Sequence, residues 1–514
     1  MIGGLFERNQ SKNSQGGGLY IEGALTISGT RFISNTARSS GGGAVAYGDA
    51  VLTDAVFEAN RSEISVGGFY GGGAVVLTGG AFERNVAVGS NFFPANAGAM
   101  EVVGALTVTG ARFISNTASN VAGGVYARSD SFLTNVLFER NQANFYGGGL
   151  YCLQTVYATG TTFISNTVTL ANGGGLAADG DVYLVGSSFE SNRAAGYGGG
   201  ASVSGAVVVS GGSFEGNVAA VGGAIHVGGT AAITGAAFIS NTSNGNDGSG
   251  VGAGALYAKD VQSDVPAVTI ADSLFQGNQA LGGYAAGALY KTKGVVTITN
   301  TQFLSNTATA DGGAIYRKGG TTNVNGSTFQ GNGTTNAGGA IYNRGGLASI
   351  NNSVFIENSS LNSNGGAIAN DSSDISSQIN NGQVVASTCT FRRNSAVADG
   401  MEGGAIYGAR TEPGGFSTNS LLINDSTFTG NDGFQGGAIS SHDVFVANNS
   451  TFYGNSATGA VATAAALAPG WRREQCQQSH PLSEHRQQRA SVRHSYFGSG
   501  WELQLQQYDP RRRE

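Results

Sequence analysis

The chain has 514 residues, a formal net charge of −6 at pH 7, and 85 glycines against only 6 prolines. The negative charge argues against a polyanion such as nucleic acid as a partner, and the absence of a Gly-X-Y period excludes collagen. Leu, Ile, Val and Phe recur at regular intervals and no run of about 20 apolar residues occurs, so neither a flexible Gly-rich linker nor a transmembrane helix is expected.

The N-terminal segment already belongs to a repeat, because a Phe-x-x-Asn motif begins at Phe6. Residues 1–6 lack the charged and apolar regions of a signal peptide, and no capping segment precedes the first repeat. Solenoid ends need polar caps to cover unpaired strand edges. We therefore expect the chain to be a piece of a larger surface protein.

The Phe-x-x-Asn motif recurs seventeen times, most often at steps of 25 or 26 residues, and its Asn is never missing. The two middle positions vary between charged, apolar and Gly, which indicates that they face solvent. The Phe positions are 6, 32, 57, 82, 113, 138, 163, 189, 214, 238, 275, 303, 329, 355, 391, 428 and 452.

Two further pieces separate successive motifs. One reads Gly-Gly-Ala or Gly-Gly-Gly, then an aliphatic residue and often Tyr, as in Gly312–Tyr316. The other alternates apolar and polar residues, as in Ala24–Ser28, which is typical of a half-buried strand. Three short strands in about 25 residues make one coil of a β-helix. The sequence thus predicts an all-β, right-handed parallel β-helix of about seventeen coils over residues 1–458, extending on the order of 80 Å.

Stacking of the coils predicts two internal ladders. Each Phe should lie inside on the Phe of the next coil, and each Asn should form an amide ladder at a turn. Representative ladder positions are Phe32, Asn35, Phe57, Asn60, Phe163, Asn166, Phe303 and Asn306.

Candidate ligand loops are expected where the period stretches, because coils accept insertions only as outward loops. Residues 61–70 and 86–96 are interpreted as insertions on successive coils, carrying Phe69, Tyr70, Phe92 and Phe93. Such aromatic side chains could form a platform for a sugar or a protein partner. The alternative, which we favour, is that they fold back over the edge of the helix.

A second group of insertions follows the Gly-Gly-Ala-Ile strand, at residues 259–265, 371–384 and 409–419. The last two occupy consecutive coils and carry Asp371, Asp374, Arg410 and Glu412. A catalytic or ligand cleft would be expected between them, although ordinary surface variation is the favoured reading.

No other residues indicate chemistry. The Glu of the FERN-type motifs recurs with the coil and is interpreted as a solvated face with Glu–Arg pairs. His226 and His442 are isolated and show no metal-ligand spacing. We therefore predict no catalytic residue, metal or cofactor.

Residues 459–514 form a non-repeat tail. Residues 471–514 hold both tryptophans and eight arginines, and no Phe-x-x-Asn motif. One reading is a basic, disordered, partner-binding tail. The other, which we favour, is translation out of frame: read one base later, the codons from Gly470 onward permit Gly-Gly-Ala-Val-Ser-Asn.

The paired Gly-Gly-Ala-aliphatic and Phe-x-x-Asn motifs over residues 3–458 resemble those of the polymorphic outer membrane proteins, whose autotransporter passengers are β-helices. They also resemble the broader pectin-lyase-like β-helix proteins. The first resemblance implies a bacterial cell-surface, outer-membrane or secreted protein. It would act as an adhesin or structural passenger and bind a host or neighbouring-cell surface protein or glycan, or associate with itself.

Two alternatives remain open. One is a polysaccharide lyase or glycoside hydrolase of the pectin-lyase-like fold, and the other is a self-assembling fibre-like surface protein. Membrane attachment would require a barrel or anchor that the printed chain does not show.

Overall fold

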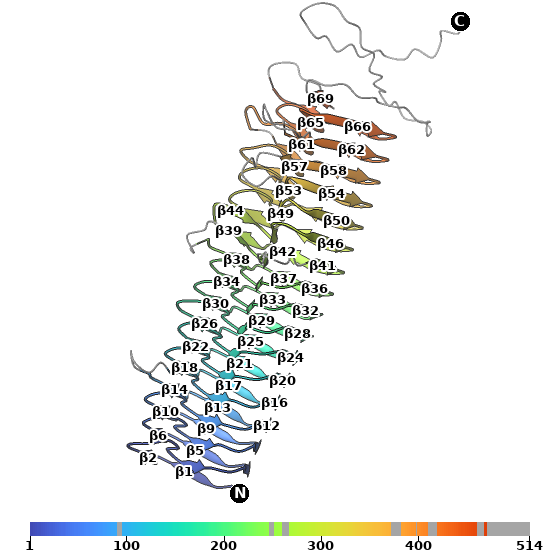
Figure 1. Ribbon diagram of the computed structural model, residues 1–514. Coiled ribbons are helices and arrows are strands. Elements are labelled where there is room, and N and C mark those ends of the chain that lie inside the picture. The colour runs from blue at the N-terminus through green and yellow to red at the C-terminus, as the bar shows by residue number, and fades with distance from the viewer. Residues whose placement is uncertain are drawn as a thin grey trace, which may run out of the picture.

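The computed structural model describes residues 1–89, 95–245, 251–259, 267–371, 382–396, 398–409, 419–459 and 467–469. These residues form a single rod of stacked β-coils, with the N-terminus at one end (Figure 1). Every strand pair is parallel and joins one coil to the next. The structure therefore confirms the predicted parallel β-helix. Within the described residues no helix is long and apolar enough to cross a membrane.

Each regular coil holds four strand segments rather than the predicted three, because the two residues that follow the motif Asn form a short strand of their own. We name the resulting sheets A to D. Sheet B has seventeen strands, each made of the motif Phe and its two neighbours, from β1 (Leu5–Glu7) to β67 (Thr451–Tyr453). Sheet C has seventeen strands of the two residues after the Asn, from β2 (Gln10–Ser11) to β68 (Ser456–Ala457).

Sheet D contains the strand that follows the paired glycines, from β3 (Leu19–Ile21) through β11 (Phe69–Gly71) to β69 (Leu467–Pro469). A separate two-stranded sheet, β39 (Val251–Ala253) and β44 (Tyr284–Ala286), lies beside sheet D.

Sheet A has sixteen longer strands. They are β4 (Leu25–Ser28), β8 (Ala50–Thr53), β12 (Val75–Thr78), β16 (Leu106–Thr109), β20 (Ser131–Thr134), β24 (Val156–Thr159), β28 (Val182–Val185), β32 (Val207–Ser210), β36 (Ala231–Thr234), β41 (Val268–Ala271), β46 (Val295–Thr299), β50 (Thr321–Asn325), β54 (Gly346–Asn351), β58 (Gly382–Ser387), β62 (Ser420–Asn424) and β66 (Val444–Asn448).

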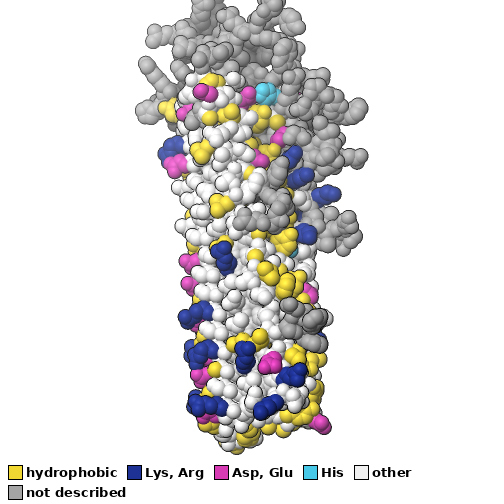
Figure 2. All heavy atoms as spheres, turned by 90° about the vertical axis from the view of Figure 1, so that its left-hand side faces the viewer, with side chains coloured by type: hydrophobic (Ala, Val, Ile, Leu, Met, Phe, Trp, Pro, Cys, Tyr) yellow, Lys and Arg dark blue, Asp and Glu magenta, His cyan; other side chains and the backbone are white. Residues whose placement is uncertain are grey.

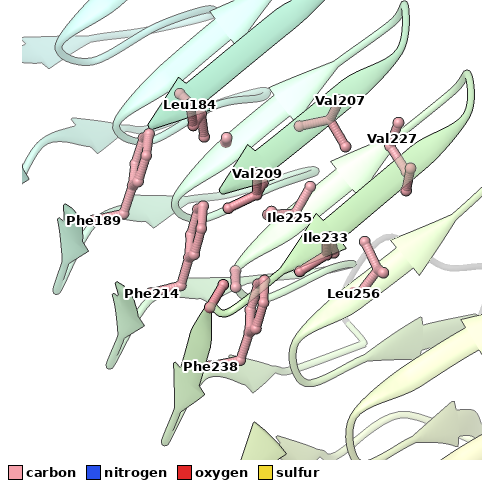
Figure 3. Close-up of a cluster of buried hydrophobic side chains, with 14 of the residues drawn as sticks. Leu184, Phe189, Val207, Val209, Phe214, Ile225, Val227, Ile233, Phe238 and Leu256 are labelled. Carbon is pink, nitrogen blue, oxygen red and sulfur yellow. The ribbon is translucent and has the colours of Figure 1, made fainter. Parts of the chain in front are cut away.

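The core is a column of side chains contributed by the inner faces of sheets A, B and D. The motif Phe rings stack face to face along it, as Figure 3 shows for Phe189, Phe214 and Phe238. The ring centroids of Phe189 and Phe214 are 4.7 Å apart with an interplanar angle of 3°. Aromatic pairs at this separation contribute about 0.5–1.5 kcal/mol beyond the apolar area they bury, so the stack strengthens every coil interface.

The motif Asn side chains form a second column at the turn between sheets B and C. Asn35 is fully buried. Its Nδ2 donates to the Phe6 carbonyl at 2.7 Å and to Asn60 Oδ1 at 3.0 Å, and its backbone N–H also donates to Asn60 Oδ1 at 3.0 Å. Because the same bonds recur from coil to coil, these buried amides are satisfied without water.

The third position of the motif has a conformational requirement that the sequence interpretation missed. Residues there have a positive φ, for example 53° at Ser34, 55° at Ser115 and 55° at Glu357. Only Ser, Arg, Ala, Glu and Gly occupy this position, and no β-branched residue does. β-Branched side chains are the least compatible with the left-handed region, so this position does not vary freely.

The paired glycines are required by close packing between coils. A Cβ on Gly313 would lie 1.9 Å from the Gly339 carbonyl oxygen of the next coil. Gly339 has the same relation to the Gly366 carbonyl oxygen, at 2.0 Å. No side chain fits at such a distance, so the backbones touch at this corner.

The last described strand alters the predicted boundary at residue 458. β69 pairs in parallel with β65 (Ile439–Ser441), with Leu467 opposite Ile439. The repeat body therefore continues to at least Pro469. Residues 470–514 of the predicted tail lie outside the described residues.

Candidate ligand-binding face

The outward face of sheet D carries an aromatic side chain at the second position of many of its strands. The rings of Tyr257, Tyr290 and Tyr316 stack with centroid separations of 5.2 and 4.9 Å. The row arises because Gly-Gly-Ala-Ile-Tyr directs the Ile inward and the Tyr outward in every coil that contains it. Ala253 and Ala286 pack against this cluster, so Tyr290 and Tyr316 are buried and Tyr257 is half-buried.

Charged groups gather on this row toward the C-terminal coils, in what we call the Tyr342 cluster: Asp311, Tyr316, Tyr342, Arg344 and Asp371. Tyr342 and Arg344 lie on β53 (Ile341–Arg344), and Asp371 ends the adjacent strand β57 (Ile368–Asp371) opposite Arg344. The Tyr342 hydroxyl donates to Asp371 Oδ2 at 2.7 Å. The cluster thus joins two carboxylates, a guanidinium and two phenols across neighbouring coils.

The electrostatics of the Tyr342 cluster are coupled. Burial is the largest cause of a raised pKa at the Asp311 carboxyl, and the Asp371 carboxylate raises this pKa further. The Ala337 N–H and Arg344 lower it, but the net shift is upward. The Ala337 N–H donates to Asp311 Oδ1 at 3.1 Å. Burial also raises the pKa of Tyr342, and the nearby Asp371 carboxylate raises it further. Tyr342 is therefore a hydrogen-bond donor at any physiological pH.

A second group, the Glu402 cluster, lies on the next coils and consists of Glu402, Tyr407, Ser440 and His442. Ser440 Oγ donates to Glu402 Oε2 at 2.6 Å, and His442 Nε2 contacts the same oxygen. Burial alone would raise the pKa of Glu402, but the hydrogen bonds from His442 and Ser440 outweigh it and hold this pKa below its usual value. Burial, Glu402 and Asp371 raise the pKa of Tyr407 to about 12. Tyr407 lies on β61 (Ile406–Gly408), which pairs with β57, so the two clusters lie side by side.

The structure does not place all the predicted ligand-loop residues on the surface. Phe69 was wrongly assigned: it is fully buried on β11, opposite Ala44 and Met100, with its ring 5.7 Å from that of Phe57. Residues 61–70 are not an insertion, since Phe57 and Phe82 are 25 residues apart and remain in register. Tyr70 faces outward but is half-buried against a small apolar cluster that includes Val66 and Val121.

Of the remaining candidates, Asp371 lies in the Tyr342 cluster. Phe92, Phe93, Asp374, Arg410 and Glu412 lie outside the described residues. The residues at the base of the two long insertions are described. Asn370 Nδ2 donates to the Gly382 carbonyl at 2.9 Å, and the Gly382 N–H donates to Asn419 Oδ1 at 3.0 Å. Asn419 Nδ2 donates in turn to the Ala409 carbonyl at 2.7 Å, so hydrogen bonds connect the bases of the two insertions.

The prediction that the histidines are isolated was wrong. His442 meets Glu402, which is 40 residues away in the sequence. The ring of His226 stacks between those of Tyr197 and Tyr257, at 4.8 and 5.7 Å. Aligning the repeats would have predicted this stacking, since His226 occupies the position that is Tyr in other coils.

Other features give little indication of chemistry. Several of the recurring Glu residues of sheet B pair with arginine on the surface, as Glu58 does with Arg84 and Glu139 with Arg140. Such exposed pairs contribute little stability. Basic and acidic side chains are interspersed along the rod (Figure 2). Among the described residues no three His, Cys, Asp or Glu side chains are placed to hold a metal ion.

A hollow of about 430 Å³ lies elsewhere, on sheet C. Its lining contains one charged side chain, that of Arg193, among Thr, Ala, Val and Asn residues. This composition offers no acid–base pair.

The stacked coils, the stacked Phe and Asn ladders and the glycine corner define a parallel β-helix repeat protein. The family model of the Chlamydia polymorphic membrane protein repeat matches residues 300–316 and 326–344. These segments include the Phe303 and Phe329 motifs, and the second one contains Tyr342 and Arg344. No curated protein matches the chain. The chain is thus a parallel β-helix repeat protein, two segments of which are similar to the polymorphic membrane protein repeat.

Proposed function

We propose that this chain is the β-helix of a bacterial cell-surface protein that acts as a non-catalytic adhesin. The matching repeat belongs to a family of membrane proteins, which supports a location at the cell surface or outer membrane. A rigid rod projects side chains away from that surface, and the partner would be a protein or glycan on a host or neighbouring cell.

The observation that carries the proposal is the pair of clusters on the outward face of sheet D. Asp371 and Glu402 are held by Tyr342 and by Ser440 and His442, respectively. Side chains fixed by such bonds form a preorganised polar surface, and preorganisation reduces the entropic cost of binding. Tyr407, which is half-buried beside Glu402, supplies apolar contact area.

The location is tested by labelling intact bacteria that express the native gene with antibodies raised against residues 1–458. Surface display predicts labelling without permeabilisation, at the level of a known surface antigen. Labelling that requires permeabilisation would refute it.

A polysaccharide-cleaving enzyme is the second candidate, and one observation favours it. Asp311 has a raised pKa and lies in the same cluster as Asp371 and Arg344, which is the type of environment that a general acid requires. If the chain cleaves a glycan, the purified protein should release reducing or unsaturated ends from acidic polysaccharides, and Asp311→Asn should abolish the release. The adhesin proposal predicts no release with either protein.

A further inference from the structure

The turns that lead from sheet D to sheet A carry a concentration of basic side chains in the C-terminal half of the rod. The chain as a whole is acidic, yet four of its five lysines lie within residues 259–318. Arg317 stands opposite Lys291, and Arg344 stands opposite Lys318 on the next coil. Like charges opposite each other on neighbouring strands destabilise a sheet. The concentration of positive charge at this corner therefore points to an anionic ligand.

Arg317 lies beneath this corner, fully buried on β49 (Ile315–Lys318). Its Nη1 donates to the Lys291 carbonyl at 3.2 Å and to the Lys293 carbonyl at 3.4 Å. Its Nη2 donates to the Gly319 carbonyl at 3.1 Å. Further acceptors are the Gly294 carbonyl, the Thr321 carbonyl and Thr322 Oγ1. The guanidinium is positive at any physiological pH, so it holds the carbonyl oxygens of two successive turns toward the interior.

The same peptide groups present their N–H groups on the opposite side. The N–H groups of Thr292, Gly294 and Gly320 share peptide groups with the carbonyls of Lys291, Lys293 and Gly319, respectively. A trans peptide group directs its N–H away from its carbonyl oxygen, so these three N–H groups point away from the guanidinium. Within the described residues none of the three donates a hydrogen bond. Neighbouring turn N–H groups without partners form concavities that bind anions.

Lysine side chains stand beside these N–H groups on the solvent side. Lys293 is exposed in the first turn, and Lys318 is partly exposed at the start of the second. Lys318 follows Arg317 and therefore lies on the coil next to Thr292. Successive coils are about 4.8 Å apart, so the flexible ammonium groups of both lysines can reach one small anion. Lysine supplies a compact point charge of the kind that binds phosphate groups.

We propose that the turns at residues 292–294 and 318–320 form a binding site for a phosphate group. Lys293, Lys318 and the three outward N–H groups donate to its oxygens. Arg317 does not touch the ligand; it positions the turns and places a fixed positive charge beneath them. Donors from two coils suit a tetrahedral dianion, which has more acceptor oxygens than a carboxylate has. The ligand is therefore a free phosphate, a phosphate monoester or the phosphate of a lipid headgroup.

Titration calorimetry of the purified full chain with inorganic phosphate tests the site. The wild-type protein should show saturable binding. Lys293→Gln combined with Lys318→Gln should weaken it by at least about tenfold, because each lost ammonium removes a charge-assisted hydrogen bond. Arg8→Gln combined with Lys12→Gln is the matched control, since it removes two positive charges from the N-terminal coil and should leave binding unchanged. Far-UV circular dichroism of each variant verifies the fold.

Cosedimentation with phosphatidylcholine vesicles, with and without phosphatidic acid, distinguishes the two sources of the phosphate. Binding to free phosphate alone identifies a soluble phosphate or phosphate ester, whereas binding that requires phosphatidic acid identifies a lipid headgroup. Either result supports the site if the Lys293 and Lys318 double variant loses it. Failure to bind both probes, or an equal loss in the double variant and in the control pair, would overturn the site. Neither probe involves a host cell, so a negative result would leave the adhesin proposal unchanged.

Discussion

Asn166 Oδ1 accepts two hydrogen bonds from Asn141, one from the backbone N–H and one from Nδ2, both at 3.0 Å. Asn166 Nδ2 donates to the Phe138 carbonyl at 2.9 Å and to Asn192 Oδ1 at 3.0 Å. A single buried side chain thus connects three coils, and the ladder repeats this arrangement along the rod.

Replacing Asn166 with Ala should destabilise the rod locally by about 2–4 kcal/mol, because it leaves two buried N–H donors of Asn141, one on the backbone and one on Nδ2, without their acceptor. Hydrogen exchange should accelerate in the coils that contain Phe138, Phe163 and Phe189 and much less elsewhere, since repeat proteins open locally. Ile164→Ala, on the outward side of the same coil, serves as the control. Equal protection in both variants would show that the ladder contributes little.

The glycine corner gives a sharper steric test. Gly313→Ala should lower stability by about 1–3 kcal/mol or prevent folding, because the added Cβ would meet the Gly339 carbonyl oxygen at 1.9 Å. Gly283→Ala is the matched control, since a Cβ there meets nothing within 4 Å. Thermal denaturation should separate the two variants. Similar midpoints would mean that the coils can move apart at this corner.

The positive φ at the third position of the Phe-x-x-Asn motif should make stability depend on whether the side chain there is β-branched. Ser165 has a φ of 53°, so Ser165→Val should cost roughly 1–2 kcal/mol, whereas Ser165→Gly should be tolerated. Chemical denaturation of both variants against the wild type measures the difference. If valine were as stable as glycine, the left-handed conformation would not constrain this position.

His226 should make stability depend on pH. Burial, with a smaller contribution from Lys259, lowers the pKa of His226 to about 4. An unfolded His titrates near 6.5, so between about pH 6.5 and pH 4 the unfolded chain binds the additional proton. The contribution of neutral His226 to the free energy of unfolding is therefore fully present above about pH 6.5 and is lost as the pH falls toward 4.

His226→Tyr, which restores the residue found at this position in other coils, should remove that component. The stability difference between the variant and the wild type should grow in favour of the variant as the pH is lowered through this window, by up to about 1.4 kcal/mol per pH unit. Denaturation curves at pH 7, 6 and 5 provide the measurement. A difference that does not change with pH would contradict the buried, neutral imidazole.

Much of the fold could be predicted from the sequence because the stacking of coils converts a linear period into a spatial column. Phe163 and Phe189 must stack if every coil is alike, and they do, at 4.6 Å. The misassignment of Phe69 arose from the aromatic residue type. It follows Gly67-Gly68 as Ala44 follows Gly42-Gly43, and that position faces inward.

The candidate site was only partly predictable. Asp371 was found because an insertion follows it, whereas Glu402 and His442 gave no local signal. Their contact depends on the exact length of the intervening coil, including its insertion, and residue spacing alone does not supply that register. Tyr342 and Arg344 were overlooked because they belong to the regular repeat, where only the neighbouring coils make one tyrosine different from another.

The most direct test of the adhesin proposal is the binding of the purified, fluorescently labelled chain to cultured epithelial cells, measured by flow cytometry. The proposal predicts saturable binding that falls about tenfold or more for Tyr342→Phe combined with Glu402→Gln, since loss of about 1.4 kcal/mol or more is expected when fixed polar contacts are removed from an interface. Glu190→Gln, on sheet B, should bind as the wild type does. Absence of saturable binding, or binding that the double variant leaves unchanged, would contradict a role for this face of the β-helix in adhesion.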